Sequence, residues 1–491
     1  MRIERMNGAP EGRLSLSRRT LRGAAWSLAS QAVLAIGALV TFVIMSRLVG
    51  HGELGEYMLA IVGVAAVQWL ALNAYREPVI QTPVLTPAIC SSVFWFSAGI
   101  AMLLSAALVA IAHYLRWDGQ LTTTASCLSV LAVKVFFDTF SSVPLALCYR
   151  ELRFPMVARL NILVSAVGLI ISIGLLNAGW GVLAVAFAQG VMSALGFALL
   201  LARCGWLPQR HFAWRDTGFL WRYSPHVVLW QGVEALNMYL DRFMVGTRLS
   251  PQALGIYGFG RRLNDVIIEI LVGAAGNVAL PAYASVQEDR AGLKRAFISS
   301  IRMATFGIFP LIGILYGVAD ELVIAVFGAK WAPAVPVYKF FLLLGAIQTI
   351  GIFQASLIRS LGHANLWARY QVAQAVANIA VLGFAIDHGI LVLAAAVVIR
   401  TYVVWTYAVA MTCRLIDMRV LEYLRMFVKP ALGAVLACIV AQGALHLTHD
   451  IPPIVMIAGA SIIAGLTYFG AALITMKSVT SDVLALIARR G

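Results

Sequence analysis

Residues 234–269 read EALNMYLDRFMVGTRLSPQALGIYGFGRRLNDVIIE and lie between long apolar runs. In this segment Glu234, Asn237 and Asp241 are three and four residues apart, so they share one face of a predicted helix. A second predicted helix carries charged residues at four-residue spacing, namely Arg261, Asp265 and Glu269. Ionisable side chains at membrane depth are costly and normally face a bundle interior or an aqueous cavity. The two charged faces therefore predict the wall of a polar cavity inside a membrane protein.

The composition supports a membrane protein. The chain has 491 residues, of which 61% are hydrophobic and 12% are charged. Soluble globular proteins are about 25% charged. Many apolar runs reach the roughly 20 residues that a helix needs to cross a bilayer, and short polar joints separate them. These features exclude a soluble enzyme and predict an all-α polytopic membrane protein.

We expect about fourteen transmembrane helices, arranged as two six-helix lobes followed by two C-terminal helices. The predicted spans of the first lobe are 23–45, 57–76, 90–114, 123–147, 157–177 and 181–202. Those of the second lobe are 225–246, 255–280, 296–318, 334–358, 367–386 and 390–413, and the last two are 428–447 and 452–475. The expected organisation is a disordered basic tail at 1–20, a first lobe at 21–203, a cytoplasmic linker at 204–224, a second lobe at 225–415, and two further helices with a short tail at 416–491.

The cations follow the predicted topology. The formal net charge is +15 at pH 7, but a nucleic-acid-binding protein would gather its cations on a soluble domain or tail. With a cytoplasmic N-terminus, most of the 37 Lys and Arg residues fall in joints on the cytoplasmic side, as the positive-inside rule requires. We therefore expect both termini in the cytoplasm and no nucleic-acid partner. The six cysteines form no CxxC pair, so we expect neither disulfides nor a metal site.

Short motifs recur at equivalent places in the two predicted lobes. Arg47-Leu48 precedes Leu54-Gly55-Glu56-Tyr57 in the first lobe, and Arg248-Leu249 precedes Leu254-Gly255-Ile256-Tyr257 in the second. Further along, Gly179 and Leu183-Ala184 match Gly389 and Leu393-Ala394 at a constant offset. Both copies begin on the same side of the membrane, so a parallel repeat is predicted to relate the lobes.

Three segments carry a family resemblance: RLVGHGELGEY at 47–57, YRELRF at 149–154 and LDRFMVGTRLSPQALGIYGFGRRL at 240–263. In this order they resemble the Wzx-type polysaccharide flippases, in the superfamily that includes the multidrug (MATE) exporters. The resemblance implies transport of a polyprenyl-pyrophosphate-linked oligosaccharide to the outer leaflet of the bacterial cell inner membrane, for exopolysaccharide, capsule or O-antigen (lipopolysaccharide) synthesis. It also implies alternating access, in which two six-helix lobes rock around a central cavity without covalent chemistry.

The implied partners are the lipid-linked oligosaccharide, membrane lipids, and the polysaccharide polymerase and glycosyltransferases of the same pathway. No cofactor is expected. The pyrophosphate of such a substrate needs cations in a shielded cavity. The candidate substrate-binding residues are cations inside predicted spans, namely Lys134, Arg261, Arg262, Lys339 and Arg400. The alternative is that Lys134 pairs with Asp138, and Arg261 with Asp265, four residues along each helix as structural ion pairs.

Acidic residues in transporters can relay protons or serve a coupling cation. The candidates for coupling to H+ or Na+ are Glu234, Asn237, Asp241, Asp265 and Glu269. The same carboxylates could equally neutralise nearby arginines, and the sequence leaves both interpretations open.

Three other functions remain open. A peptidoglycan-precursor flippase would also carry a polyprenyl pyrophosphate, whereas an acid-dominated cavity would favour a MATE-like exporter of small amphiphilic cations. A membrane glycan polymerase or ligase would need an acceptor-binding loop on the outer face, where the predicted joints are short. The chain contains no GxxxxGK[ST], HExxH or GxSxG motif. A transporter, not an enzyme, is therefore predicted.

Overall fold

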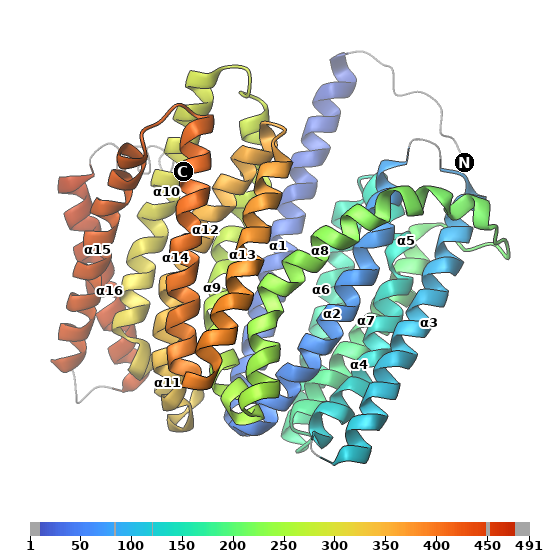
Figure 1. The fold of residues 1–491 in the computed structure, drawn as a ribbon, viewed down its shortest axis with the longest axis horizontal. Helices are drawn as coiled ribbons and strands as arrows, with labels where there is room; N and C mark the ends of the chain where they lie inside the picture. Colours follow the sequence, from blue (N-terminus) through green and yellow to red (C-terminus); the bar gives the residue numbers. More distant parts are fainter. Residues whose placement is uncertain (1–9, 83–84, 120, 448–451, 477–491) are drawn as a thin grey trace. The chain divides into compact units, whose positions relative to one another are not determined.

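The computed structural model describes residues 10–82, 85–119, 121–447 and 452–476, and every regular element within these ranges is a helix. The chain divides into two compact units, Met1–Ala235 and Leu236–Gly491. Figure 1 shows the long helices of each unit packed lengthwise against one another. These two units are defined by the packing of the chain, and the boundary between them falls inside one helix. The predicted boundaries of the two lobes therefore remain predictions.

The first unit contains α1 (Pro10–Leu48), α2 (His51–Gln81), α3 (Pro87–Asp118), α4 (Thr122–Phe140), α5 (Ser142–Arg150), α6 (Phe154–Asn177) and α7 (Val182–Cys204). Within it α1 packs on α6, and α4 packs on both α3 and α7. The short helix η1 (Trp214–Thr217) leads into α8 (Gly218–Met244), which enters the second unit.

The second unit continues with η2 (Val245–Leu249), α9 (Pro251–Ala284), α10 (Arg290–Gly317), α11 (Ala319–Phe327), η3 (Ala329–Ala334), α12 (Val335–Ser360), α13 (Ala364–Ala385), η4 (Ile386–His388), α14 (Ile390–Leu415), α15 (Val420–His446) and α16 (Pro453–Thr475). Here α12 packs on α9 and α14, and α15 packs on α10 and α16.

Within the described residues, ten segments are long and apolar enough to cross a membrane. One of them combines α4 with α5, and two are the C-terminal helices α15 and α16. The helices α2, α8, α9 and α13 overlap other predicted spans but are not among the ten. An all-α polytopic membrane protein is therefore confirmed, while the count of about fourteen spans remains a prediction.

Local sequence explains where several helices begin. Both α3 and α9 have proline in the first turn, where its missing N–H is no loss. A hydroxyl caps each helix: Thr86 Oγ1 accepts a hydrogen bond from Ile89 N at 3.2 Å, and Ser250 Oγ accepts one from Ala253 N at 3.1 Å. The break between α4 and α5 precedes Pro144, whose ring nitrogen cannot donate the hydrogen bond that would continue α4.

One prediction about the N-terminus is wrong. Helix α1 begins at Pro10, so residues 10–20 of the predicted disordered tail are helical. Proline suits the first helical turn, and the leucines and arginines that follow have good helix propensity. Residues 1–9 and the predicted C-terminal tail at 477–491 lie outside the described residues.

Some positions of the repeated motifs have the same local structure in both units. Tyr57 and Tyr257 are both buried. Gly179 and Gly389 precede α7 and α14 with φ values of 83° and 88°, a left-handed region that glycine enters without steric penalty. These agreements support the predicted parallel repeat.

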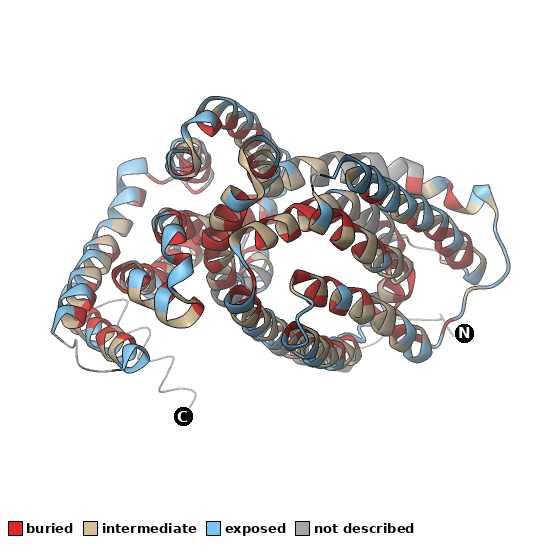
Figure 2. Ribbon diagram, turned by 90° about the horizontal axis from the view of Figure 1, so that it is seen from below, coloured by how far each residue is buried: buried red, intermediate tan, exposed pale blue. Residues whose placement is uncertain are grey.

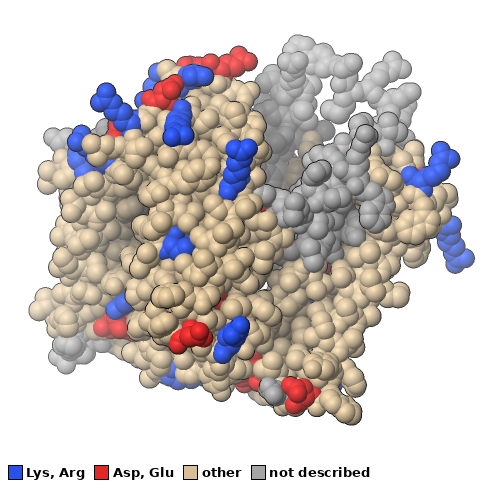
Figure 3. Space-filling view, in the orientation of Figure 1, with Lys and Arg blue, Asp and Glu red and all other residues tan. Residues whose placement is uncertain are grey.

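Buried apolar residues hold each unit together. In the second unit Trp331 of η3 stacks on Phe259 of α9, with ring centroids 4.2 Å apart. Figure 2 shows that buried residues gather where helices of a unit face one another, with exposed residues on their outer sides. On the visible face in Figure 3, each unit is mainly uncharged between its ends. This distribution is expected of helices that contact lipid.

Candidate functional site

A buried charged cluster joins the end of α8 to α9 in the second unit. We call it the Asp241 cluster, and its members are Asp241, Arg242, Tyr257, Arg261 and Asp265. Asp241 is 1% exposed, and its Oδ2 accepts hydrogen bonds from Arg261 Nη1 at 2.9 Å and from the Tyr257 hydroxyl at 2.8 Å. Its Oδ1 accepts one from the backbone N of Arg242 at 2.9 Å. Both oxygens of this buried carboxylate are therefore occupied.

A second carboxylate completes the Asp241 cluster. Asp265 pairs with Arg242 and has its Oδ1 3.7 Å from Nε of Arg261. Two carboxylates thus face two guanidinium groups, and their formal charges cancel. The Arg261 guanidinium also lies over the Phe341 ring of α12, 5.1 Å from its centroid, where a cation–π attraction adds to the pairing.

The structure brings some of the predicted site residues together. Asp241, Arg261 and Asp265 come together, but the closest partner of Arg261 is Asp241 on the preceding helix. Arg242 was missed, although it makes an ion pair with Asp265. Its position directly after Asp241 carries no signal that its side chain reaches across to α9.

Arg400 on α14 has only neutral hydrogen-bond partners within the described part of the chain. Its Nη1 donates to Gln374 Oε1 at 2.5 Å, and its Nη2 donates to Asn378 Oδ1 at 3.1 Å. Both partners lie on α13. Arg400 is thus a partly buried cation without a direct ion pair among these residues.

Two coupling candidates lie along α8 before Asp241. Asn237 donates from Nδ2 to the backbone oxygen of Gln371 on α13 at 3.0 Å, which ties the two helices together. Its Oδ1 is buried and accepts no hydrogen bond from any residue that the structure describes. Glu234 lies about one turn further back and is partly buried.

Two candidate cations of the second unit are already paired near the surface. Arg262 Nη1 lies 2.8 Å from Oε1 of Glu269, whose side chain is half exposed. Lys339 Nζ lies 2.5 Å from Oδ2 of Asp320, which is also half exposed. Water screens such pairs, so these two cations and Glu269 are weaker candidates than the residues of the Asp241 cluster.

The first unit has one candidate cation, Lys134 on α4. Its Nζ lies 2.6 Å from Asp138 Oδ2 and donates to Gln68 Oε1 at 3.1 Å. Gln68 on α2 also donates to Asp138 at 2.7 Å. The predicted pair of Lys134 with Asp138 is therefore present. The ammonium has three donor hydrogens, so one of them remains for a ligand.

Within the described residues, no group of three or more His, Cys, Asp or Glu side chains could hold a metal ion. The second unit offers a charge-balanced Asp241 cluster and the cation Arg400, and the first unit offers Lys134, whose ammonium keeps donor capacity.

The chain matches a known family and several curated proteins. Residues 44–336 match the family described as "Polysaccharide biosynthesis protein". The chain is 21% identical over 357 residues to the teichuronic acid biosynthesis protein TuaB of Bacillus subtilis (strain 168), covering 72% of this chain and 73% of that protein. It is 20% identical over 371 residues to the lipopolysaccharide biosynthesis protein WzxC of Escherichia coli (strain K12), covering 73% of each. It is 22% identical over 375 residues to the succinoglycan biosynthesis transport protein ExoT of Rhizobium meliloti (strain 1021), covering 76% of this chain and 75% of that protein.

Two solved structures show a similar fold. The inward closed conformation of the lipid II flippase MurJ has a TM-score of 0.72 at 13% identity, covering 95% of this chain and all of that one. An inward-facing multidrug resistance MATE family transporter of the MOP superfamily has a TM-score of 0.60 at 14% identity, covering 80% of this chain and 99% of that one. Because a fold supports many functions, these likenesses establish architecture alone.

Proposed function

Because the chain belongs to the family of polysaccharide biosynthesis proteins, we propose that it flips a polyprenyl-pyrophosphate-linked oligosaccharide across the bacterial inner membrane by alternating access. The glycan would serve exopolysaccharide, capsule or O-antigen synthesis. One relative is named as a transport protein of succinoglycan biosynthesis and another as a lipopolysaccharide biosynthesis protein. These names support a membrane transporter in a polysaccharide pathway, and not an enzyme.

The proposal rests on the position of Arg400 and on its hydrogen-bond partners. It lies on α14, one of the candidate membrane spans, and its hydrogen bonds go to neutral amide oxygens. A guanidinium in that setting keeps its charge and presents a planar set of donors, which suits a phosphate oxygen pair. We assign Arg400 the role of a pyrophosphate contact in the second unit. Lys134 is the equivalent candidate in the first unit.

The Asp241 cluster has a different role in this proposal. Its carboxylates offset the cost of burying the Arg261 and Arg242 cations, because a buried charge is costly unless it is paired and hydrogen-bonded. Neutralisation of the two arginines is the role that these contacts support for the carboxylates, and coupling to H+ or Na+ remains a prediction.

The rival functions fit these contacts less well. A MATE-like exporter of cations would need an acid-dominated site, whereas the Asp241 cluster is charge-balanced and Arg400 is a further cation of the same unit. A glycan polymerase or ligase would need a sizeable acceptor loop, but α6 joins α7 through residues 178–181 and α13 joins α14 through residues 386–389. A peptidoglycan-precursor flippase carries the same pyrophosphate, so the cations alone do not separate it from the proposal.

The purified chain in proteoliposomes tests the proposal. The vesicles contain a fluorescent polyprenyl-pyrophosphate-linked oligosaccharide in both leaflets, and an impermeant quencher is added outside. The protein should raise the quenched fraction from half to nearly all of the lipid, and protein-free vesicles should not.

Two other lipids in the same assay separate the rivals. A polyprenyl-monophosphate-linked sugar should move slowly, because it lacks the second phosphate. Faster transfer of a peptide-bearing peptidoglycan precursor than of the oligosaccharide lipid would favour the peptidoglycan-precursor flippase. No transfer of any lipid would refute the flippase proposal.

A further inference from the structure

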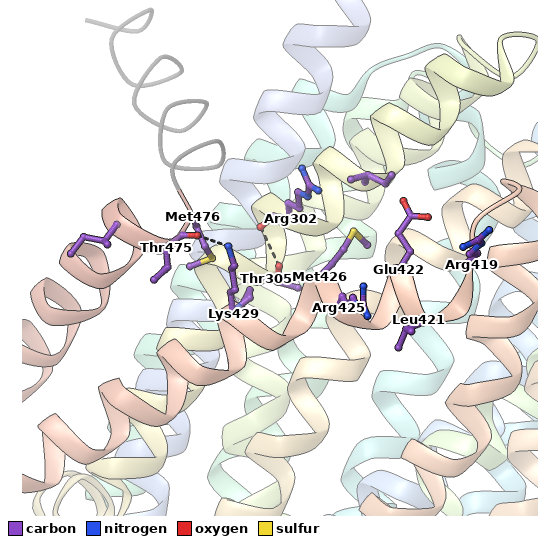
Figure 4. A pocket seen from close by; sticks show the side chains of 13 residues that line it. Arg302, Thr305, Arg419, Leu421, Glu422, Arg425, Met426, Lys429, Thr475 and Met476 are labelled. Carbon is purple, nitrogen blue, oxygen red and sulfur yellow. Dashed lines mark hydrogen bonds between the residues drawn. The ribbon is translucent and has the colours of Figure 1, made fainter.

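A cation-rich pocket lies where α10, α15 and α16 meet at one end of the second unit. Its volume is about 770 Å³. Figure 4 shows Arg302 from α10, Arg419 directly before α15, and Arg425 and Lys429 from α15 along its wall, with Glu422 as the acidic lining residue. We call it the α15 pocket. It contains none of the ten residues predicted for substrate binding or coupling.

The charges of the α15 pocket are unbalanced. Arg302, Arg419 and Arg425 make no ion pair with any residue that the structure describes. Lys429 donates from Nζ to the backbone oxygen of Thr475 at 2.7 Å, which satisfies a carbonyl at the end of α16. Four cations facing one carboxylate repel one another, so an anion with several acceptor oxygens would stabilise the pocket.

Two neighbouring cations at the same end of the unit have partners within the protein. Arg290 Nη1 lies 3.2 Å from Oδ2 of Asp417, and Lys294 Nζ donates to the backbone oxygen of Asp417 at 2.9 Å. Arg290 and Lys294 lie at the start of α10, and Asp417 lies between the end of α14 and the start of α15. Protein groups therefore satisfy these two cations just outside the α15 pocket, whereas the arginines of its wall have no such partner among the described residues.

An apolar surface runs from the α15 pocket along the same helix. The exposed apolar residues of α15 at three- and four-residue spacing are Leu421, Leu424, Val428, Leu432, Val435 and Ile439. This spacing places them on one face. Ile474, from α16, is also exposed at the pocket. A ligand that fits both parts needs an anionic head and long apolar chains.

We propose that the α15 pocket binds the phosphate headgroup of an anionic phospholipid, whose acyl chains lie along the exposed apolar face of α15. Guanidinium and ammonium groups donate charge-assisted hydrogen bonds to phosphodiester oxygens. Basic pockets between membrane helices on the cytoplasmic side suit anionic headgroups, which are concentrated in that leaflet. The predicted topology puts all four cations on that side. The proposal does not depend on the flippase activity.

Lipid retention tests the proposal. The full chain is incorporated into phosphatidylcholine nanodiscs with increasing phosphatidylglycerol, and bound lipid is measured by native mass spectrometry after release into detergent. The double variant Arg302→Gln/Arg425→Gln should bind phosphatidylglycerol about 30-fold more weakly, from the loss of two cations near the phosphate. The matched control Arg369→Gln/Arg414→Gln removes two exposed cations of the same predicted side outside the pocket, and it should change binding less than about threefold.

The same preparation distinguishes the sources of phosphate. Inorganic phosphate and a short polyprenyl pyrophosphate are added as competitors, and melting temperature is recorded to show that each variant is folded. Displacement of phosphatidylglycerol only by excess polyprenyl pyrophosphate would support a lipid headgroup site. Tighter binding of the polyprenyl pyrophosphate than of phosphatidylglycerol, or equal losses in the double variant and the control, would overturn the proposal. A folded double variant with unchanged phosphatidylglycerol binding would overturn it as well.

Discussion

Replacing Asp241 by asparagine removes a buried negative charge and leaves the size of the side chain nearly unchanged. In the native cluster, Arg261 has Asp241 Oδ2 at 2.9 Å and Asp265 Oδ1 at 3.7 Å. After Asp241→Asn, only the more distant carboxylate remains, and Arg242 already uses it. The variant therefore places two guanidinium groups against one carboxylate inside the second unit.

The magnitude follows from the burial of this pair. The side chains of Asp241 and Arg261 are 2% and 9% exposed. Removing one partner of a buried ion pair destabilises a protein by about 3–5 kcal/mol, because the other charge stays buried without compensation. The asparagine oxygen can still accept the Tyr257 hydrogen bond, so the lower half of that range is expected, about 3 kcal/mol.

Equilibrium unfolding in mixed micelles of increasing sodium dodecyl sulfate content measures this change. Asp417→Asn is the matched control, because its pair with Arg290 is mostly exposed and should contribute at most about 1 kcal/mol. The double variant Asp241→Leu/Arg261→Leu should recover most of the loss, since it leaves neither charge of that pair buried. A change for Asp241→Asn no larger than that of Asp417→Asn would refute the reasoning.

Three further outcomes are expected. Arg400→Gln should slow flipping of the pyrophosphate-linked oligosaccharide at least tenfold in the proteoliposome assay, because the substrate loses one charged hydrogen-bonding partner. The control Arg262→Gln should change the rate less than threefold, because that cation is already paired with Glu269. Gly313→Ala should lower the melting temperature of the purified protein, since the new Cβ would lie 2.1 Å from the backbone oxygen of Ala434 and push α10 from α15; an unchanged value would show that the helices separate freely. Lys134→Gln should slow flipping in the proteoliposome assay. It should lower the free energy of unfolding by only about 1 kcal/mol in the micelle titration, because the pair of Lys134 with Asp138 is only partly buried. Unaltered transport would show that Lys134 does not contact the substrate.

Part of the site could be predicted from helical spacing. The face through Asn237 and Asp241 and the face through Arg261 and Asp265 were identified because residues three and four apart share one side of a helix. The partner of Lys134 on its own helix, Asp138, was identified for the same reason. Partners on other helices were not: Gln68 of α2 binds Lys134, and Gln374 of α13 binds Arg400.

The N-terminal tail shows a second limit to what can be predicted from the sequence. Basic composition predicted disorder there, but residues 10–20 continue the first helix. Helix formation propagates easily once it has begun, so a long apolar helix extends into a neighbouring segment with adequate propensity. A boundary of this kind depends on the adjoining element more than on local charge.

Composition and periodicity were sufficient for an all-α membrane protein and two charged helices, because lipid requires long apolar helices and restricts charges to particular faces. The family resemblance rested on particular sequence segments. Only packing decided which charges neutralise each other. Arg261 pairs chiefly with Asp241 of the preceding helix, and Arg400 is left with amide oxygens alone among the described residues. The physical reason is that helical spacing orders neighbours along one helix, whereas the separation and rotation of two helices depend on all the side chains between them.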